Sequence, residues 1–298
     1  MDSGVVLLDG GMGQELRKRR QDGDKTFWGT GVLIEAPHEV KEVHTDYINA
    51  GARVITTNTY ALLRTRLDEW GLSQDKFPEL MDRAGRLAVE ARRETGGDVL
   101  IAGSLPPLNG SYLPDNVRPF DEIEPIYREH VALLAPHVDL FLCETMSTGA
   151  EGYAAAHAAQ TSGKPVWVAW TLKDGGSSLL RSGETLNQAW AVLDGLSVEA
   201  VLANCCWPES ISAAMKEMNG LGAPHAGGYA NGFAGIPDNW TVKEKGVGVL
   251  GQRQEFGPDT YANHVADWIA DGATIVGGCC EVGPAHIARL SAMLKEAA

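Results

Sequence analysis

Long apolar runs and a basic leader segment are both missing from this 298-residue chain. No stretch approaches the roughly 20 consecutive apolar residues that a membrane-spanning helix needs. The first residues, Met-Asp-Ser-Gly, lack the positive charge that begins a secretory signal peptide. The sequence therefore predicts a cytoplasmic protein that does not associate with a membrane.

Basic residues are also scarce. The chain has 25 lysines and arginines against 39 aspartates and glutamates, a formal net charge of −14. Nucleic-acid phosphates would be repelled by this balance, so we expect no nucleic-acid partner. A cationic small molecule is mildly favoured as a substrate. The hydrophobic share of 44% and the charged share of 21% are typical of a globular protein.

Cysteines are few, and their number, five, is odd. All five lie in or beside apolar runs and do not show the spacing of a disulfide framework. In a reducing compartment, thiols in such places are typical of metal sites or catalysis.

Short runs rich in Val, Ile and Leu recur along the whole chain and alternate with stretches of helical periodicity, which indicates repeated βα units. Eight such repeats favour a closed α/β fold, the (β/α)8 TIM barrel, as a single domain over residues 1–298. The predicted strands are 5–9, 54–58, 99–104, 139–144, 166–171, 200–204, 225–229 and 273–277. The predicted helices include 37–50, 78–95, 150–162, 210–219, 261–271 and 284–297.

Polar residues stand at or just after the end of each predicted strand. In a closed barrel these ends converge on one face, where the active site lies. We therefore expect one polar site built from Asp9, Asn58, Ser104, Glu144, Thr171, Cys205, Tyr229 and Cys279.

Two cysteine pairs follow strands, at 205–206 and 279–280. Three thiolates around zinc leave a fourth position open for a substrate. Gly277 and Gly278 would give the chain the freedom to turn both Cys279 and Cys280 toward one metal. The alternative is that these are buried free cysteines acting as small hydrophobic residues. That alternative is our expectation for Cys206 and Cys143, which alternate away from Cys205 and Glu144.

Asp9 and Glu144 end apolar strands, where an unpaired buried carboxylate would be costly. A substrate ammonium group would be a suitable partner, and the amides of Gly10 and Gly11 could bind an anion such as a carboxylate. Two alternatives stay open at this point. Asp9 could simply cap the next helix, and Glu144 could pair with an arginine.

Three aromatic residues, Trp28, Tyr60 and Trp207, lie in or near loops that follow strands. Aromatic faces can surround a sulfonium or quaternary ammonium group through cation–π attraction. Ordinary packing is the alternative for all three.

These residues together resemble the homocysteine S-methyltransferases, a zinc-dependent barrel family that includes betaine–homocysteine methyltransferase. The resemblance covers nearly the whole chain, and its most specific parts are Asn-Cys and Gly-Gly-Cys-Cys. It is carried by residues 8–16, 44–52, 56–60, 144–145, 204–205 and 277–287.

The resemblance implies a role for each matching residue. Cys205, Cys279 and Cys280 would hold zinc. Homocysteine would bind through its ammonium group to Asp9 and Glu144 and through its carboxylate to Gly10 and Gly11. The remaining substrate contacts would come from Tyr60, Trp28 and Asn231. The chain departs from the family pattern in two places, Ala203 where glycine is usual and Ala230 where proline is usual.

The implied reaction moves a methyl group from a sulfonium donor to the zinc-bound thiolate of homocysteine and produces methionine. The chain ends soon after Gly-Gly-Cys-Cys and has no room for folate or corrinoid domains, so S-methylmethionine is the expected donor, with S-adenosylmethionine as a second. Betaine, dimethylsulfoniopropionate or a separate methyl-corrinoid protein are alternatives, and a homo-oligomer is a further expectation. A zinc hydrolase and a thiol redox sensor are rival functions. Scattered histidines disfavour the hydrolase.

Overall fold

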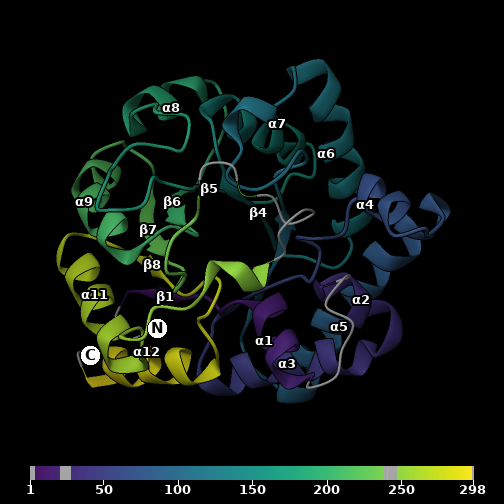
Figure 1. Cartoon of the computed structure of the whole chain (residues 1–298), viewed down its shortest axis with the longest axis horizontal. Coiled ribbons are helices and arrows are strands. Elements are labelled where there is room, and N and C mark those ends of the chain that lie inside the picture. The colour runs from purple at the N-terminus through teal and green to yellow at the C-terminus, as the bar shows by residue number, and fades with distance from the viewer. Residues whose placement is uncertain (1–3, 21–27, 238–239, 241–246, 297–298) are drawn as a thin grey trace.

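Eight parallel strands form the centre of the molecule (Figure 1). The computed structural model describes residues 4–20, 28–237, 240 and 247–296. The strands are β1 (Val6–Leu7), β2 (Val54–Thr56), β3 (Leu100–Leu105), β4 (Leu140–Met146), β5 (Val166–Trp170), β6 (Ala200–Asn204), β7 (His225–Tyr229) and β8 (Ile275–Val276). Each falls within or within two residues of a predicted run.

The sheet closes on itself. Its hydrogen-bonded order is β1-β8-β7-β6-β5-β4-β3-β2. A parallel bridge between Leu8 and Val54 then joins the first strand to the second. The predicted (β/α)8 barrel is therefore confirmed.

Helices surround the strands on all sides in Figure 1. The helix predicted over 37–50 has those bounds, and the other predicted helices begin or end within a few residues of the observed ones. None of the described helices is both long and apolar enough to cross a bilayer. The helices are α1 (Met12–Arg19), α2 (Trp28–Glu35), α3 (Pro37–Ala50), α4 (Arg64–Glu69), α5 (Phe77–Thr95), α6 (Phe120–Leu134), α7 (Gly149–Gln160), α8 (Leu186–Val192), α9 (Pro208–Asn219), α11 (Pro258–Ala270) and α12 (Pro284–Glu296), with short 3-10 turns at Gln74–Lys76, Pro114–Asn116 and Val247–Leu250.

Local sequence signals explain where several helices begin and end. The hydroxyl of Thr148 accepts a hydrogen bond from the Glu151 amide and so caps α7. Helix α3 starts with Pro37 and stops at Gly51, whose φ of 110° is in the left-handed region that glycine tolerates best.

Strand alternation creates two apolar layers. Along β4, Leu140 and Leu142 face the barrel interior, whereas Phe141 and Cys143 pack outward against the helices. Glu144 continues the inward series at the end of the strand that leads to the site. The predicted outward placement of Cys143 is confirmed.

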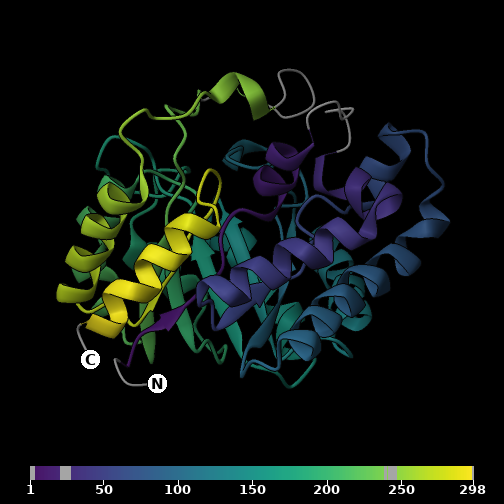
Figure 2. The same cartoon turned by 90° about the horizontal axis from the view of Figure 1, so that it is seen from below.

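A third apolar cluster lies over one end of the barrel. Tyr112, Phe233, Trp240 and Leu250 pack there against Cys205. Figure 2 shows the segment around Val247–Leu250 at the end of the barrel opposite to the chain termini. This cluster excludes water from one side of the mouth.

Candidate active site

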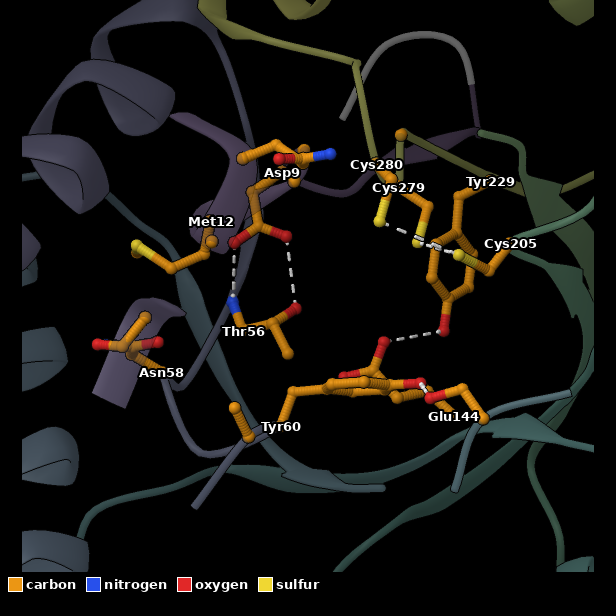
Figure 3. A pocket seen from close by; sticks show the side chains of 18 of the residues that line it. Asp9, Met12, Thr56, Asn58, Tyr60, Glu144, Cys205, Tyr229, Cys279 and Cys280 are labelled. Atoms are coloured by element: carbon orange, nitrogen blue, oxygen red, sulfur yellow. Dashed lines mark hydrogen bonds between the residues drawn. The ribbon is translucent and has the colours of Figure 1, made fainter. Parts of the chain in front are cut away.

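Three cysteine sulfurs meet at the barrel mouth (Figure 3). Cys205 follows β6, and Cys279 and Cys280 follow β8. The Sγ atom of Cys205 lies 2.8 Å from that of Cys279 and 3.9 Å from that of Cys280. All three sulfurs lie within 4.8 Å of one another. The structure therefore brings together the three predicted metal ligands.

The backbone of Cys205 adopts an unusual conformation that turns its side chain into the site. In β6, Ala200 and Leu202 face inward, whereas Val201 and Ala203 face outward. Continued alternation would point Cys205 outward. Its φ of 50° interrupts the alternation, so Cys205 reaches the mouth and Cys206 packs into the outer core.

The two glycines before Cys279 act differently from the prediction. Neither Gly277 nor Gly278 is among the glycines with positive φ. A Cβ atom on Gly277 would lie 2.4 Å from the Cβ of Leu8, and one on Gly278 would lie 2.0 Å from Val282 Cγ1. The glycines are therefore needed because the chain passes close to β1 and to its own next turn, and neither of them uses a left-handed backbone conformation.

Hydrogen bonds converge on the Cys205 sulfur. The Tyr112 hydroxyl lies 2.9 Å from it and the Asn231 amide nitrogen 3.9 Å. Burial opposes ionisation of Cys205, but hydrogen bonds from Cys279, Cys280 and Tyr112 outweigh it and lower the pKa of this thiol well below its usual value. The same contacts raise the pKa of Cys279 and Cys280. These shifts favour the charged form at Cys205 and the neutral form at Cys279 and Cys280, so a bound cation would be needed to hold all three as thiolates.

The donor set fits zinc. Tetrahedral zinc with bonds of about 2.3 Å to sulfur holds its ligands about 3.8 Å apart, so small shifts of Cys279 suffice. Cys206 is buried on the other side of β6, and burial raises the pKa of its thiol to about 12. Cys205, Cys279 and Cys280 have the number and chemistry of a zinc site with one direction open to the cavity.

Two buried carboxylates face the same cavity from other strands (Figure 3). Asp9 is 3% exposed and accepts hydrogen bonds from the Thr56 amide at 2.7 Å and the Thr56 hydroxyl at 3.0 Å. Glu144 is 8% exposed and accepts from the Ser104 hydroxyl and, at 3.5 Å, from the Tyr229 hydroxyl.

Neither of the simpler alternatives holds for these carboxylates. Helix α1 has Gly11 at its N-cap position and no side-chain cap. In the described part of the chain, no lysine, arginine or histidine forms an ion pair with Asp9 or Glu144. Both carboxylates therefore lack a cationic partner among the described residues.

Burial controls the ionisation of both groups. It raises the pKa of Asp9 to about 7, against the opposing hydrogen bonds from Thr56. It raises the pKa of Glu144 to about 8, to which the nearby charges of Asp9 and Cys205 also contribute. A cation in the cavity would reverse both shifts, because it stabilises the charged forms.

Of the two glycine amides that follow Asp9, only one is free to donate a hydrogen bond to another described residue or to a ligand. The Gly11 amide donates to the Val282 carbonyl at 3.0 Å, so the predicted contact of this amide with a substrate carboxylate is not supported. Among the described residues, the Gly10 amide has no acceptor, and it lies beside the first turn of α1. Helix N-termini favour anions.

Four strained residues surround the site. They are all of the described non-glycine residues with left-handed φ: Tyr112, Thr145, Cys205 and Glu281. Thr145 is held by Asn204, whose amide oxygen accepts from the Thr145 amide at 2.8 Å and whose amide nitrogen donates to the Thr145 hydroxyl at 2.9 Å. Asn204 of the Asn-Cys motif is therefore hydrogen-bonded to Thr145 of the Glu144-Thr145 pair, and these bonds fix the backbone beside Glu144.

Aromatic side chains form much of the remaining cavity wall. The empty space of the cavity is about 980 Å³ when its open mouth is included. Its lining aromatics are Tyr60, Tyr112, Tyr229, Phe233 and Trp240. Tyr60 is a predicted site residue, and its hydroxyl lies 2.7 Å from that of Ser111.

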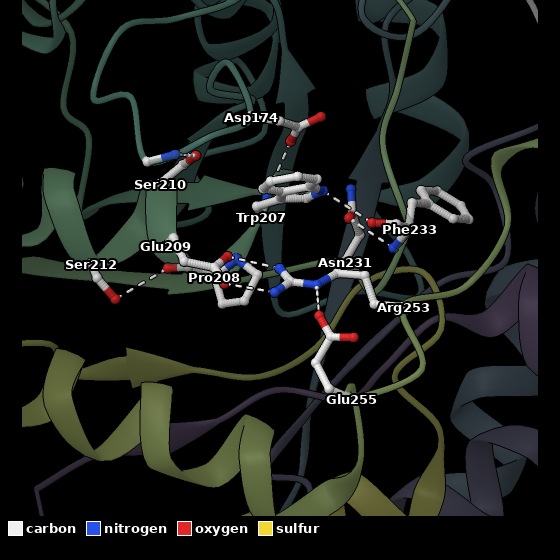
Figure 4. Close-up of polar contacts among 11 residues, drawn as sticks. Asp174, Trp207, Pro208, Glu209, Ser210, Ser212, Asn231, Phe233, Arg253 and Glu255 are labelled. Atoms are coloured by element: carbon white, nitrogen blue, oxygen red, sulfur yellow. Dashed lines mark hydrogen bonds and ion pairs between the residues drawn. The ribbon is translucent and has the colours of Figure 1, made fainter.

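The other two predicted aromatics have different outcomes. The side chain of Trp28 falls outside what the structure describes, although the residue begins α2. Trp207 is not part of the cavity wall: its indole nitrogen donates to the Phe233 carbonyl at 3.0 Å, and the Arg253 guanidinium stacks over its ring at 4.9 Å (Figure 4). Trp207 holds the segment that carries Phe233, and Phe233 itself reaches the cavity.

Asn231 lies outside the cavity lining. It was expected to contact substrate, but it contacts the Cys205 sulfur and is not among the lining residues. Ser104, expected at the site from its strand-end position, contacts Glu144 through its hydroxyl. Thr56, Tyr112 and Arg66 were not predicted as individual site residues. Strand-end position could have indicated Thr56, whereas Tyr112 and Arg66 come from loops or helices and carry no local signal.

Comparisons with known proteins match nearly the whole length of this chain to one family. A family model described as "Homocysteine S-methyltransferase" matches residues 6–294. Homocysteine S-methyltransferase of Escherichia coli K12 is 30% identical, with 97% of this chain and 94% of that protein covered. A selenocysteine methyltransferase of Astragalus bisulcatus is 26% identical, with 94% and 89% covered.

Solved structures show the same similarity. The crystal structure of the metallated form of the homocysteine methyltransferase MmuM from Escherichia coli superposes with a TM-score of 0.80 at 29% identity. It covers 97% of this chain and 96% of that one.

Proposed function

Because this chain belongs to the homocysteine S-methyltransferase family, we propose that it transfers a methyl group from S-methylmethionine to the sulfur of homocysteine. S-adenosylmethionine is the second candidate donor. The products are methionine from homocysteine and, with the first donor, a second methionine as leaving group. One observation carries the proposal, namely that one cavity holds three thiols and two buried carboxylates, neither of which forms an ion pair with a described residue.

Zinc is the proposed metal, held by Cys205, Cys279 and Cys280, and its chemistry is to keep the bound substrate sulfur as a thiolate at neutral pH. Tyr112 and Asn231 orient the Cys205 sulfur through the contacts described above. Such outer contacts tune metal affinity. The apolar cluster of Phe233, Trp240 and Leu250 shields this side of the site from water.

The acceptor has a complementary group for each of its charges. Asp9 and Glu144 would bind the ammonium group from two sides, and Thr56, Ser104 and Tyr229 hold these carboxylates in place. The Gly10 amide and the first turn of α1 would bind the carboxylate. Holding the acceptor at three points would fix the direction of its sulfur, which lowers the barrier to transfer.

The donor side is aromatic. A sulfonium group among Tyr60, Tyr112, Phe233 and Trp240 would be stabilised by cation–π attraction. The methyl group would pass in line to the homocysteine thiolate, while the pair of electrons of the breaking bond stays on the donor sulfur. The leaving group is then neutral at sulfur, so its attraction to the aromatic walls weakens after transfer.

A donor screen tests the function. Zinc-loaded protein, homocysteine and each donor would be incubated and methionine measured by mass spectrometry. We expect turnover with S-methylmethionine and less with S-adenosylmethionine. Turnover only with betaine or dimethylsulfoniopropionate would replace S-methylmethionine as the proposed donor. Turnover only with a methyl-corrinoid protein would show that this protein works together with a second protein. No methionine from any donor would contradict the proposal.

Ligand affinity should depend on pH in a defined direction. Asp9, with a pKa of about 7, and Glu144, with a pKa of about 8, are largely protonated at about pH 6 in the free protein. An ammonium group needs their charged forms, so we expect methionine to bind roughly tenfold more tightly at about pH 8 than at pH 6. Methionine is the right probe because its thioether has no proton to lose. Calorimetry on Asp9→Asn should show a shallower slope, and a flat profile for the unmodified protein would contradict this assignment.

Three further features remain proposals of ours. Residues 1–298 would act as one homocysteine-binding domain, the protein would be cytoplasmic, and it would assemble as a homo-oligomer or work with a separate corrinoid protein if the donor screen points there.

A further inference from the structure

One positively charged side chain lines the cavity. Arg66 lies in the short helix α4, partly buried, with its side chain on the cavity wall near Tyr60. It is the one cationic residue among the described lining residues. The feature stands out because the rest of the lining is aromatic, neutral or acidic.

Arg66 has no ion-pair partner in the described ranges of the chain. Its neighbour in the same helix behaves differently: Arg64 forms an ion pair with Glu129 at 2.6 Å and stacks over Phe77 at 4.7 Å. Glu69, three residues further along the helix, is exposed, and its charge acts on Arg66 through space, with no ion pair between these two described residues. Burial lowers the pKa of the Arg66 guanidinium, which shows the cost of keeping this charge away from water.

The acceptor does not need this charge. In the proposed function, on which this inference rests, homocysteine already has Asp9 and Glu144 for its ammonium group, Gly10 and the α1 terminus for its carboxylate, and the cysteine site for its sulfur. A guanidinium binds carboxylates through two parallel hydrogen bonds. The unmatched group must therefore come from the other substrate.

We propose that Arg66 binds the carboxylate of the methyl donor and thereby selects zwitterionic donors, those that carry a carboxylate together with the methylated onium centre. The onium group lies among the aromatic side chains and the carboxylate lies at α4. Arg66 is thus a specificity-determining residue that fixes the orientation of the donor, and it takes no part in the bond changes at sulfur.

The test compares two donors that differ only by the carboxylate: S-methylmethionine and (3-aminopropyl)dimethylsulfonium. For the unmodified protein we expect kcat/KM to favour S-methylmethionine by about 10- to 100-fold, the effect of a charge-assisted, two-point contact. Arg66→Met should raise the KM for S-methylmethionine by a similar factor and reduce the preference to near one. Arg66→Lys should retain part of it, because the charge remains.

Two controls separate a binding role from a structural one. Arg64→Met removes an arginine from the same helix without touching the cavity, and it should leave the donor preference unchanged. The dissociation constant of homocysteine, measured by calorimetry on zinc-loaded Arg66→Met, should stay within about twofold of the unmodified protein, as expected for separate subsites.

Several outcomes would overturn the inference. If Arg66→Met weakens homocysteine binding and leaves the donor KM unchanged, the residue serves the acceptor. If Arg66→Met lowers kcat/KM equally for both donors, Arg66 only supports the fold. If the unmodified protein transfers no methyl group from any donor, the proposed function fails, and direct calorimetry of S-methylmethionine against both proteins still decides whether Arg66 binds a carboxylate.

Discussion

Cys279→Ala is expected to abolish both zinc retention and methyl transfer. The variant leaves two sulfurs from two strands, and the Cys205 sulfur loses its nearest neighbour, which lies 2.8 Å away. Two thiolates cannot complete the three-ligand site, so the bound substrate thiol would no longer be held as thiolate. Metal content after dialysis, measured by mass spectrometry, should fall from about one equivalent to near zero. Methionine formation should fall by about 1,000-fold or more.

Cys206→Ala is the matched control. It removes a buried thiol from the neighbouring position, but that thiol packs into the outer core and contributes no ligand. We expect full zinc content and activity close to that of the unmodified protein, with a stability loss of about 1 kcal/mol from the small cavity. Zinc and activity retained in Cys279→Ala, or lost in Cys206→Ala, would refute the ligand assignment.

Glu144→Gln should produce the second large effect, a loss of about 100- to 1,000-fold in kcat/KM for homocysteine. The substitution keeps the shape of the side chain and removes the charge that would pair with the ammonium group in a buried cavity. Breaking a buried pair by removing one partner costs about 3–5 kcal/mol. Zinc content should not change, because the carboxylate is not a ligand. Calorimetry with homocysteine and steady-state kinetics would measure the two quantities.

Glu151→Gln offers a control with similar burial. Glu151 is 3% exposed, accepts a hydrogen bond from the Ser147 amide at 2.8 Å, and burial raises the pKa of its carboxyl to about 7. It does not line the cavity. Its substitution should change stability but not homocysteine affinity. Equal loss of affinity in both variants would mean that Glu144 acts through folding and not through the substrate.

The fold was predictable because its main signal is local. Apolar runs of strand length alternate with helical segments, and burial of both faces of a parallel strand makes those runs easy to detect. Eight repeats favour closure, which the Leu8 to Val54 bridge confirms. The strand-end positions of Asp9, Glu144, Cys205 and Cys279 follow from the same reasoning, since every strand of a barrel ends on one face.

Residues outside the strands were harder to place. Trp207 follows a strand, as predicted, yet its ring stacks under Arg253 and leaves the cavity wall to Phe233 and Trp240, which lie far along the chain. Gly11 stands two residues after Asp9, but its amide already donates a hydrogen bond to the Val282 carbonyl. Such contacts depend on which distant segment reaches a loop, and no periodicity in the sequence encodes that.

The amino-acid order alone specified a (β/α)8 barrel, a soft-metal site and a pair of acidic residues at its mouth, because strand period and residue chemistry are local properties. The tertiary structure decided how Cys205 of the 205–206 pair reaches the cavity, through the left-handed backbone of this residue that breaks strand alternation. It also placed Arg66 on the cavity wall with no ion-pair partner among the described residues. Both outcomes depend on packing between segments far apart in the chain, where close contact and burial override the local pattern.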